Sequence, residues 1–199
     1  ALPDVQLPRD GRPLVGATPI FVPMAQEAGF RWELDALEAK VTPRTKLLVI
    51  NSPANPTGFV ADRRTLEGIA GLAERHDLLV LADESFERLI YDGRQHVSFG
   101  ALPGMFERTI TVQSCTKSYA LPSWRVGYVA GPEALVTCFR KVLEWMVLSC
   151  PAVPQSVATA AITGPQDWIE TLIRRHQESR DRVMAALAGI PGVSFVLAR

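Results

Sequence analysis

Three short apolar runs in this chain each end in a polar stretch, and this restricts the folds that the chain can adopt. The runs are TKLLVI (residues 45–50), DLLVLAD (77–83) and RTITV (108–112), and helix-type segments alternate with such runs. Continuous apolar runs of this length are typical of strands in a parallel sheet, and alternation with amphipathic helices indicates layers around that sheet. We therefore predict an α/β fold, a three-layer sandwich with a mostly parallel sheet.

The other predicted elements follow from periodicity and from end signals. Asp62 can cap a helix over residues 62–76, in which apolar side chains recur at helical spacing. Pro132 suits the first position of another helix, and Gly189 and Pro191 end a long helix over residues 167–188. Short strands are expected over residues 18–22, 127–131 and 193–197.

The polar stretches after the three runs are NSPANPTG, ADES and QSCTK. The carboxyl ends of parallel strands share one edge of a sheet, and ligands of open α/β sheets bind in the crevice outside that edge. We therefore expect the three stretches to converge on one crevice.

Composition excludes several classes of function. Lys plus Arg and Asp plus Glu both number 21, so the zero net charge gives no general attraction to nucleic acid or to an anionic membrane. No apolar run approaches the roughly 20 residues of a membrane span. The three cysteines are scattered, which indicates reduced thiols and a cytoplasmic location, and the three histidines show no metal-ligand spacing.

Charged and hydroxyl side chains gather at the predicted strand ends. Asp83 alone could be a helix cap or a structural ion pair, Lys117 a surface lysine, and Arg125 a salt-bridge residue. Together with the hydroxyls of Ser114 and Thr116 they form a more informative set. Pyridoxal phosphate needs an amine for its aldehyde, a carboxylate for its ring nitrogen and an anion site for its phosphate.

The motifs in this set are similar to those of a known family. NSPANPTG resembles the family pattern NPxNPTG, DESF resembles Asp-x-x-Tyr, and SCTKSYALPSWRVGY resembles SxSKxxxxxGxRxGY. In these three motifs and in their order, the chain resembles the fold-type I, class I and II aminotransferases related to aspartate aminotransferase. The resemblance covers almost the whole chain, and it implies the large domain of a pyridoxal-phosphate-dependent transferase.

The resemblance implies a role for each matching position. Lys117 would be the Schiff-base lysine and proton shuttle, and Asp83 would pair with the pyridinium nitrogen. Asn55 would donate to the phenolic oxygen of the cofactor, and the Asn55–Pro56 peptide would be cis. The phosphate would be held by Ser114, Thr116 and Arg125. The implied reaction transfers the amino group of an α-amino acid to a 2-oxo acid.

Two positions depart from the family pattern. Phe86 replaces a tyrosine at the cofactor site, so it cannot donate a second hydrogen bond to the phenolic oxygen. The pKa of the Schiff base should then be higher than in a Phe86→Tyr variant, unless Phe86 simply packs and other groups compensate. Ser123 replaces a glycine and would be strained if that position needs a positive φ. Cys115 is expected to be a buried filler.

The resemblance also implies that family members are longer at both ends. Residues 1–185 would form most of the large domain, without its N-terminal part, and residues 186–199 would begin a small domain. The arginine that binds the substrate carboxylate would lie beyond Arg199. A homodimer is implied as well, and the stretch from Leu148 to Gln155 either reaches toward the partner or only connects two helices.

Three interpretations of function stay open at this point. The first is an aminotransferase that acts on amino acid and 2-oxo acid substrates, without a nucleic acid or membrane partner. The second is another pyridoxal phosphate reaction on the same fold, such as a C–S lyase, a decarboxylase or an oxidase, because fold does not fix reaction. The third is a non-catalytic, truncated homologue that keeps the fold.

Overall fold

The computed structural model describes residues 16–197, and its centre is a small sheet with strands in chain order. Strands β1 (Leu47–Asn51), β2 (Leu79–Asp83) and β3 (Thr109–Ser114) are parallel, and β4 (Gly127–Ala130) runs antiparallel to β3. The register places Asn51 beside Asp83 and Asp83 beside Val112, so the strands end at one edge. The α/β class with a mostly parallel sheet is confirmed.

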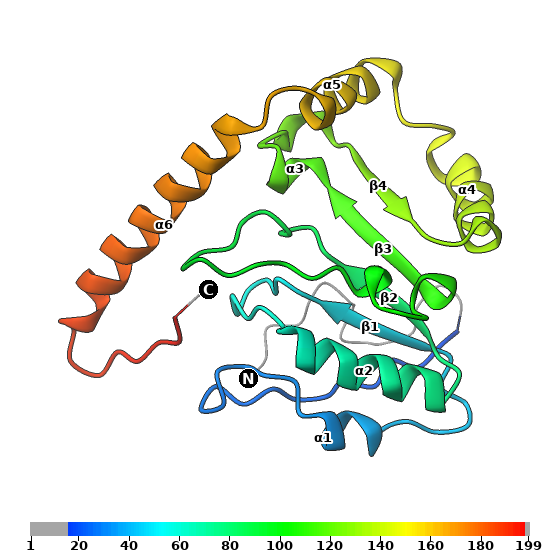
Figure 1. The fold of residues 1–199 in the computed structure, drawn as a ribbon, viewed down its shortest axis with the longest axis horizontal. Coiled ribbons are helices and arrows are strands. Elements are labelled where there is room, and N and C mark those ends of the chain that lie inside the picture. Colours follow the sequence, from blue (N-terminus) through cyan, green and yellow to red (C-terminus); the bar gives the residue numbers. More distant parts are fainter. Residues whose placement is uncertain (1–15, 198–199) are drawn as a thin grey trace.

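Seven further elements lie before or between the strands, or follow them directly. The helices are α1 (Leu34–Glu38), α2 (Arg63–Arg75), α3 (Cys115–Ser118) and α4 (Glu133–Val147). Three short 3₁₀ helices cover residues Phe99–Ala101, Phe106–Arg108 and Pro122–Trp124. Two more helices, α5 (Ala152–Thr163) and α6 (Asp167–Ala188), complete the described chain, and α6 extends away from the sheet (Figure 1).

Helix α2 forms as the sequence predicts, because its signals are local. The carboxylate of Asp62 accepts a hydrogen bond of 2.8 Å from the backbone N–H of Thr65, which satisfies one of the free donors of the first turn. Ile69, Leu72 and Ala73 are fully buried on one side of the helix. That side packs on one face of the sheet, where the core residues of β1 and β2 are Ile50, Val80 and Ala82.

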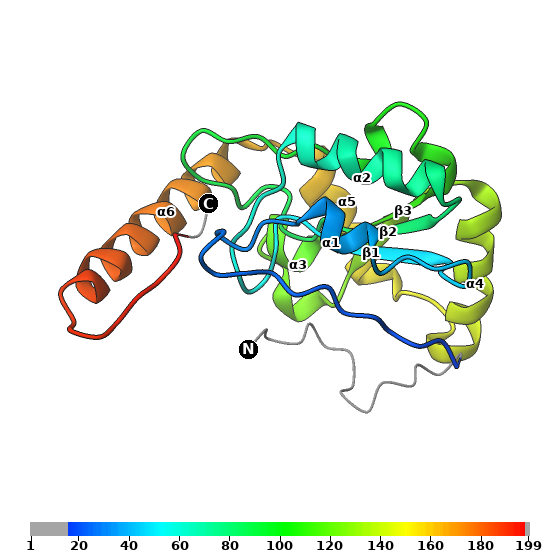
Figure 2. The same ribbon diagram turned by 90° about the horizontal axis from the view of Figure 1, so that it is seen from below.

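The opposite face of the sheet carries apolar side chains that stay exposed within residues 16–197. Strand alternation puts Leu47 and Val49 on this face, with Leu79 beside Leu47, and their exposed fractions are 48%, 56% and 39%. In Figure 2, α2 lies against one side of the sheet. A second, smaller core of Cys115, Tyr119, Ala158 and Ile169 joins α3 to α5 and α6.

Two predicted strands are wrong. Residues 18–22 and 193–197 have no strand geometry, although both are rich in β-type residues. A strand needs a neighbouring strand for its hydrogen bonds, and neither segment pairs with one in the described part of the chain. Pro19 also removes one donor from the first segment, and Pro23 follows it directly.

The helix predictions differ from the structure in smaller ways. Pro132 is the N-cap of α4 and not its first residue. The long C-terminal helix has the predicted bounds, Asp167–Ala188, and it runs without a break past residue 185. Helix α5 was not predicted, and it begins at Ala152 inside the stretch 148–155 that we expected to be a connector or a partner-facing segment. Among the described residues, no helix is long and apolar enough to span a membrane.

Candidate functional site

The ends of β1 and β2 are joined by the side chain of Asn51. Its Nδ2 donates to the backbone oxygen of Asp83 at 3.1 Å, and its Oδ1 accepts from the backbone N–H of Asn55 at 2.9 Å. Asn51 therefore fixes the loop that carries Asn55 to the strand that carries Asp83. The side chain of Asn55 is exposed in this loop, and the Asn55–Pro56 peptide is cis as expected. The Ser52–Pro53 peptide is also cis, which was not expected.

Asp83 is half-buried at the end of β2 and is held by the next turn. Its Oδ1 accepts two hydrogen bonds from Ser85, one from the backbone N–H at 3.0 Å and one from Oγ at 2.6 Å. Its other oxygen, Oδ2, accepts no hydrogen bond from any residue between 16 and 197. The structure thus orients this carboxylate through one oxygen and leaves the second able to accept a donor from a ligand.

Lys117 lies in α3, directly after β3, and faces the turn that follows Asp83. Its Nζ is 5.3 Å from the centroid of the Phe86 ring, a distance at which the aromatic face attracts a cation. The side chain is exposed and forms no ion pair with any of the described residues. The lysine and the turn after the aspartate, which are predicted to share one crevice, are therefore in contact through Phe86.

The predicted anion-binding side chains come together in part. Arg125 Nη1 donates to Thr116 Oγ1 at 3.5 Å and to the backbone oxygen of Pro122 at 3.1 Å. Ser114, the last residue of β3, precedes Thr116 at the start of α3, and its side chain makes no capping hydrogen bond there. These residues offer a guanidinium and two hydroxyls at the end of β3, the donor set that a phosphate needs.

The strain predicted at Ser123 falls on other residues. Ser123 lies inside a 3₁₀ helix, and the left-handed conformations in this segment belong to Ala120 (φ 51°) and Arg125 (φ 50°). A glycine position in an aligned motif does not say which neighbour takes the positive φ. Here the left-handed residue is Arg125, so the unusual backbone helps to set the direction of the guanidinium.

Sequence reasoning missed three residues of this site. Asn51 and Glu84 both lie next to the polar end of an apolar strand, and this is the same signal that indicated Asp83. Ser85 follows two carboxylates in a turn, where a hydroxyl readily bonds a neighbouring side chain. The sequence could not show that Glu84 points away from Asp83, with an exposed fraction of only 3%.

Burial sets the titration of several groups beside the site. Burial raises the pKa of the Glu87 carboxyl, with Arg88 and His96 opposing that shift. Burial also raises the pKa of the Cys115 thiol, which fits the expected role of this residue as a buried filler. Burial, together with the nearby Glu87, raises the pKa of Tyr128 to about 12.

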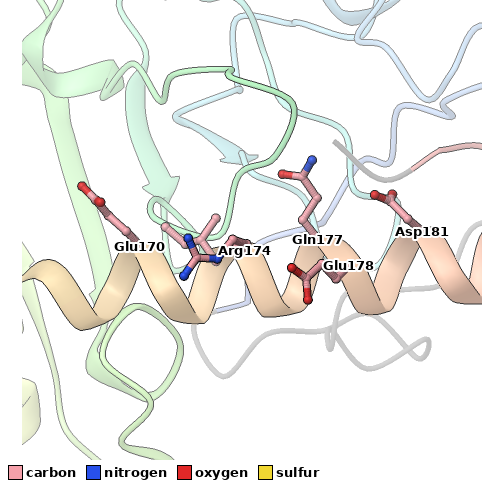
Figure 3. A pocket seen from close by; sticks show the side chains of 6 residues that line it. Glu170, Arg174, Gln177, Glu178 and Asp181 are labelled. Atoms are coloured by element: carbon pink, nitrogen blue, oxygen red, sulfur yellow. The ribbon is translucent and has the colours of Figure 1, made fainter.

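Two shallow cavities lie away from these residues. One, of about 310 Å³, is lined along α6 by Glu170, Ile173, Arg174, Gln177, Glu178 and Asp181 (Figure 3). The other, of about 540 Å³, is lined by polar and small side chains of α5. None of the predicted site residues lines either cavity. The predicted residues Asp83, Phe86 and Lys117 make their contacts just after β2 and β3, away from both cavities. We therefore place the candidate site at the strand ends.

Comparison with known proteins matches most of this chain to one family. The family profile of aminotransferase class I and II matches residues 10–198. The arginine–pyruvate transaminase of Pseudomonas aeruginosa is 39% identical over 178 residues, which are 89% of this chain and 45% of that protein. The aromatic-amino-acid aminotransferase 2 of Thermococcus litoralis is 39% identical in an alignment of 187 positions that covers 90% of this chain and 47% of that protein.

Solved structures show the same similarity. The aromatic aminotransferase of Pyrococcus horikoshii superimposes with a TM-score of 0.85 at 38% identity, covering 90% of this chain and 49% of that one. The aspartate aminotransferase of Rhizobium meliloti gives a TM-score of 0.85 at 32% identity, covering 88% and 44%. The chain thus spans about half the length of the relatives that it matches.

Proposed function

This chain belongs to the class I and II aminotransferases, and from that premise we propose that it carries the cofactor-binding part of an enzyme that transfers the amino group of an α-amino acid to a 2-oxo acid. The proposed cofactor is pyridoxal 5'-phosphate. Residues 1–185 are proposed to belong to the large domain and residues 186–199 to the start of a small domain. Residues 1–15 and 198–199 of these ranges lie outside the described structure.

The residues at the strand ends fit this cofactor. Asp83 Oδ2 is without a protein donor among the described residues, so it can accept the ring N–H, and Lys117 Nζ is free of ion pairs there, so it can react as an amine. The phosphate is proposed to bind at the side chains of Ser114, Thr116 and Arg125. Asn55 is proposed to donate to the phenolic oxygen, and Phe86 to line the site beside Lys117.

Each residue has a distinct task in the proposed reaction. When bound, pyridoxal phosphate supplies an aldehyde for an amine and a ring that withdraws electrons from the α-carbon of the substrate. Lys117 Nζ would be the amine that holds the aldehyde carbon, and the same nitrogen could take up and return a proton. Asp83 would hold the ring nitrogen in its protonated form, because a carboxylate favours a nearby cation. The hydroxyls and Arg125 orient the group through its phosphate.

The contact of Lys117 with the turn that begins after Asp83 is the observation that carries this proposal. It places an amine that has no ion pair in the described structure at the turn that follows a carboxylate whose second oxygen is available. The test is incubation with pyridoxal phosphate, reduction with borohydride and mass spectrometry of the Lys117 peptide. We expect the adduct on Lys117 in the wild type, none at that position in Lys117→Ala, and an unchanged adduct in Lys141→Ala, which alters an exposed lysine of α4.

An adduct spread equally over the lysines would refute a dedicated site at Lys117. Weak binding in Asp83→Asn, with the adduct still confined to Lys117, would support the proposed role of the carboxylate. The type of reaction needs a separate assay on the longer protein. If the 2-oxo acid forms only when an amino acceptor is added, the result favours transamination. If it forms without an acceptor, the result favours the lyase alternative. Phe86 in place of tyrosine is the departure from the family pattern that keeps this alternative open.

We also propose that the protein forms a homodimer, and that it works in a reducing compartment such as the cytoplasm. The apolar side chains of α4 and its C-cap support the first proposal, since Trp145, Met146 and Leu148 have exposed fractions of 92%, 71% and 78%. Large contiguous apolar surfaces of this kind mark interaction sites. The described cysteines, Cys115, Cys138 and Cys150, are all free thiols, which fits the second proposal.

A further inference from the structure

The turn from Glu84 to Glu87 has an inner and an outer side. It is closed by a hydrogen bond of 2.9 Å from the backbone N–H of Glu87 to the backbone oxygen of Glu84. The two middle residues serve the candidate site, because Ser85 donates to Asp83 and Phe86 lies against Lys117. The two end residues, Glu84 and Glu87, turn their carboxylates toward the interior.

The amide of Gln113 holds both end residues of this turn. Gln113 Nε2 lies 3.1 Å from Glu87 Oε2 and 3.5 Å from Glu84 Oε2, so one nitrogen donates toward two carboxylates. Gln113 is nearly buried in β3, one residue before Ser114. Two carboxylates repel a carbonyl oxygen, and this fixes which end of the amide faces them.

The position of Gln113 carries a cost to stability. Its Oε1 is buried and has no hydrogen-bond partner among residues 16–197. A buried carbonyl oxygen without a donor destabilises the folded state. An apolar side chain of the same size would avoid that cost, so the benefit of glutamine here lies in its two contacts to the turn.

Glu84 ties the same turn to a second segment. Its carboxylate also accepts hydrogen bonds from His96 Nε2 at 2.8 Å, from Ser98 Oγ at 3.1 Å and from the backbone N–H of Phe99 at 2.8 Å. A buried carboxylate with this many donors is held in one orientation. The first residue of the turn is therefore fixed even when Gln113 is changed. Glu87 at the other end has the hydrogen bond from Gln113 at 3.1 Å and a longer ion pair of 3.9 Å between its Oε1 and Arg88 Nε, so Gln113 is its nearer partner.

We propose that Gln113 is a positioning residue that acts through the turn from Glu84 to Glu87 and holds the ring of Phe86 against Nζ of Lys117. The importance of this for catalysis rests on the function proposed for Lys117, but the physical claim does not. The side-chain amide of Gln113 donates toward Glu84 and Glu87, and within residues 16–197 it has no hydrogen bond to Lys117 or to a residue proposed to bind cofactor. Gln113 fixes Glu87, the last residue of the turn, and the ring of Phe86 in the middle of the turn is thereby held beside Nζ of Lys117.

The test measures the reactivity of Lys117 in the chain without pyridoxal phosphate. Acetic anhydride modifies neutral amines, and mass spectrometry gives its rate at Lys117 relative to the exposed Lys141. The ring of Phe86 holds the amino group of Lys117 against its face and shields it from the reagent. Gln113→Met keeps the volume and removes the donor, so modification of Lys117 should be about two- to fivefold faster, the range for loss of an exposed cation–π contact. Phe86→Leu should give a similar increase.

The double variant separates positioning from a general loss of stability. If Gln113 acts through the ring, Gln113→Met combined with Phe86→Leu reacts no faster than Phe86→Leu alone. Multiplied effects in the double variant, or an unchanged rate in Gln113→Met while Phe86→Leu reacts faster, would overturn the proposal. Gln155→Met, the same exchange on exposed α5, should leave the rate unchanged. If Gln113→Met does not fold, Glu87→Met takes its place in the test, because it removes the hydrogen bond between Gln113 and Glu87 by changing the acceptor.

This result is independent of the proposed function. Failure to form a pyridoxal adduct on Lys117 would refute the cofactor site but would leave the acetylation rates interpretable. Conversely, a normal adduct with unchanged acetylation rates in the Gln113 and Glu87 variants would refute the positioning role alone.

Discussion

The close approach of β4 to β3 gives a sharp prediction for Gly127→Ala. A Cβ built on Gly127 would lie 2.5 Å from the backbone oxygen of Gln113 and 3.5 Å from Cα of Ser114. Since Cβ atoms essentially never approach closer than 3.0 Å, the strands must separate by at least about 0.5 Å (3.0 − 2.5) at the pair formed by Ser114 and Gly127. The obstacle is backbone, which cannot rotate away as a flexible side chain can.

The expected cost is that of overpacking, about 1–3 kcal/mol of unfolding free energy. Urea unfolding followed by circular dichroism measures it. The matched control is Gly71→Ala in α2, where the new Cβ meets only the flexible end of Arg75 at 3.4 Å. That change should stabilise the protein by about 0.5–1 kcal/mol, because glycine is a poor helix former. Equal stabilities of Gly127→Ala and the wild type would refute the reasoning, since it would mean that β4 is not held this close to β3.

Three further predictions follow from individual contacts. Burial raises the pKa of Glu87 above its unfolded value of 4.5, so the folded state prefers the protonated form, and stability should fall as pH rises from about 4.5 through the folded pKa. Melting temperatures from acid to neutral pH should therefore show Glu87→Gln gaining on the wild type as pH rises, and a constant difference would contradict this. Asp62→Ala should cost about 1 kcal/mol in urea unfolding through loss of the cap to Thr65, and Asp62→Asn, which keeps the acceptor, should cost much less. Trp145→Lys should convert the proposed dimer to monomers in sedimentation experiments, and an unchanged mass would exclude α4 from the interface.

The locally encoded elements were predictable from the sequence. Helix α2 begins after Asp62 and α6 ends before Gly189, because caps and breakers act within one turn of the residues that they affect. The strand end at Asp83 was also predictable, since an apolar run changes to polar residues there, whereas β3 continues two residues past its predicted end at residue 112, to Ser114. The segments 18–22 and 193–197 show the limit of such patterns, because strand formation depends on a partner that may lie anywhere in the chain.

The candidate site divides in the same way. The residue types for a cofactor (Asp83, Lys117, Asn55 and the hydroxyls near Arg125) could be named from motifs, while their roles stay predictions. The contacts behind them could not be named. Gln113, Glu84 and Glu87 are ordinary polar residues in the sequence, and nothing local indicates that one amide donates toward two carboxylates.

The sequence by itself determined the α/β class and the chemical groups at the strand ends, because these follow from periodicity and from side-chain chemistry, and it indicated the family through the resemblance of three motifs. The tertiary structure alone decided that Asn51 joins the loop of Asn55 to the end of β2, that Phe86 lies against Lys117 and that the amide of Gln113 donates toward Glu84 and Glu87. Those contacts join residues from separate strands and turns. Their geometry is set by strand register and packing, which depend on the whole fold and not on neighbouring residues.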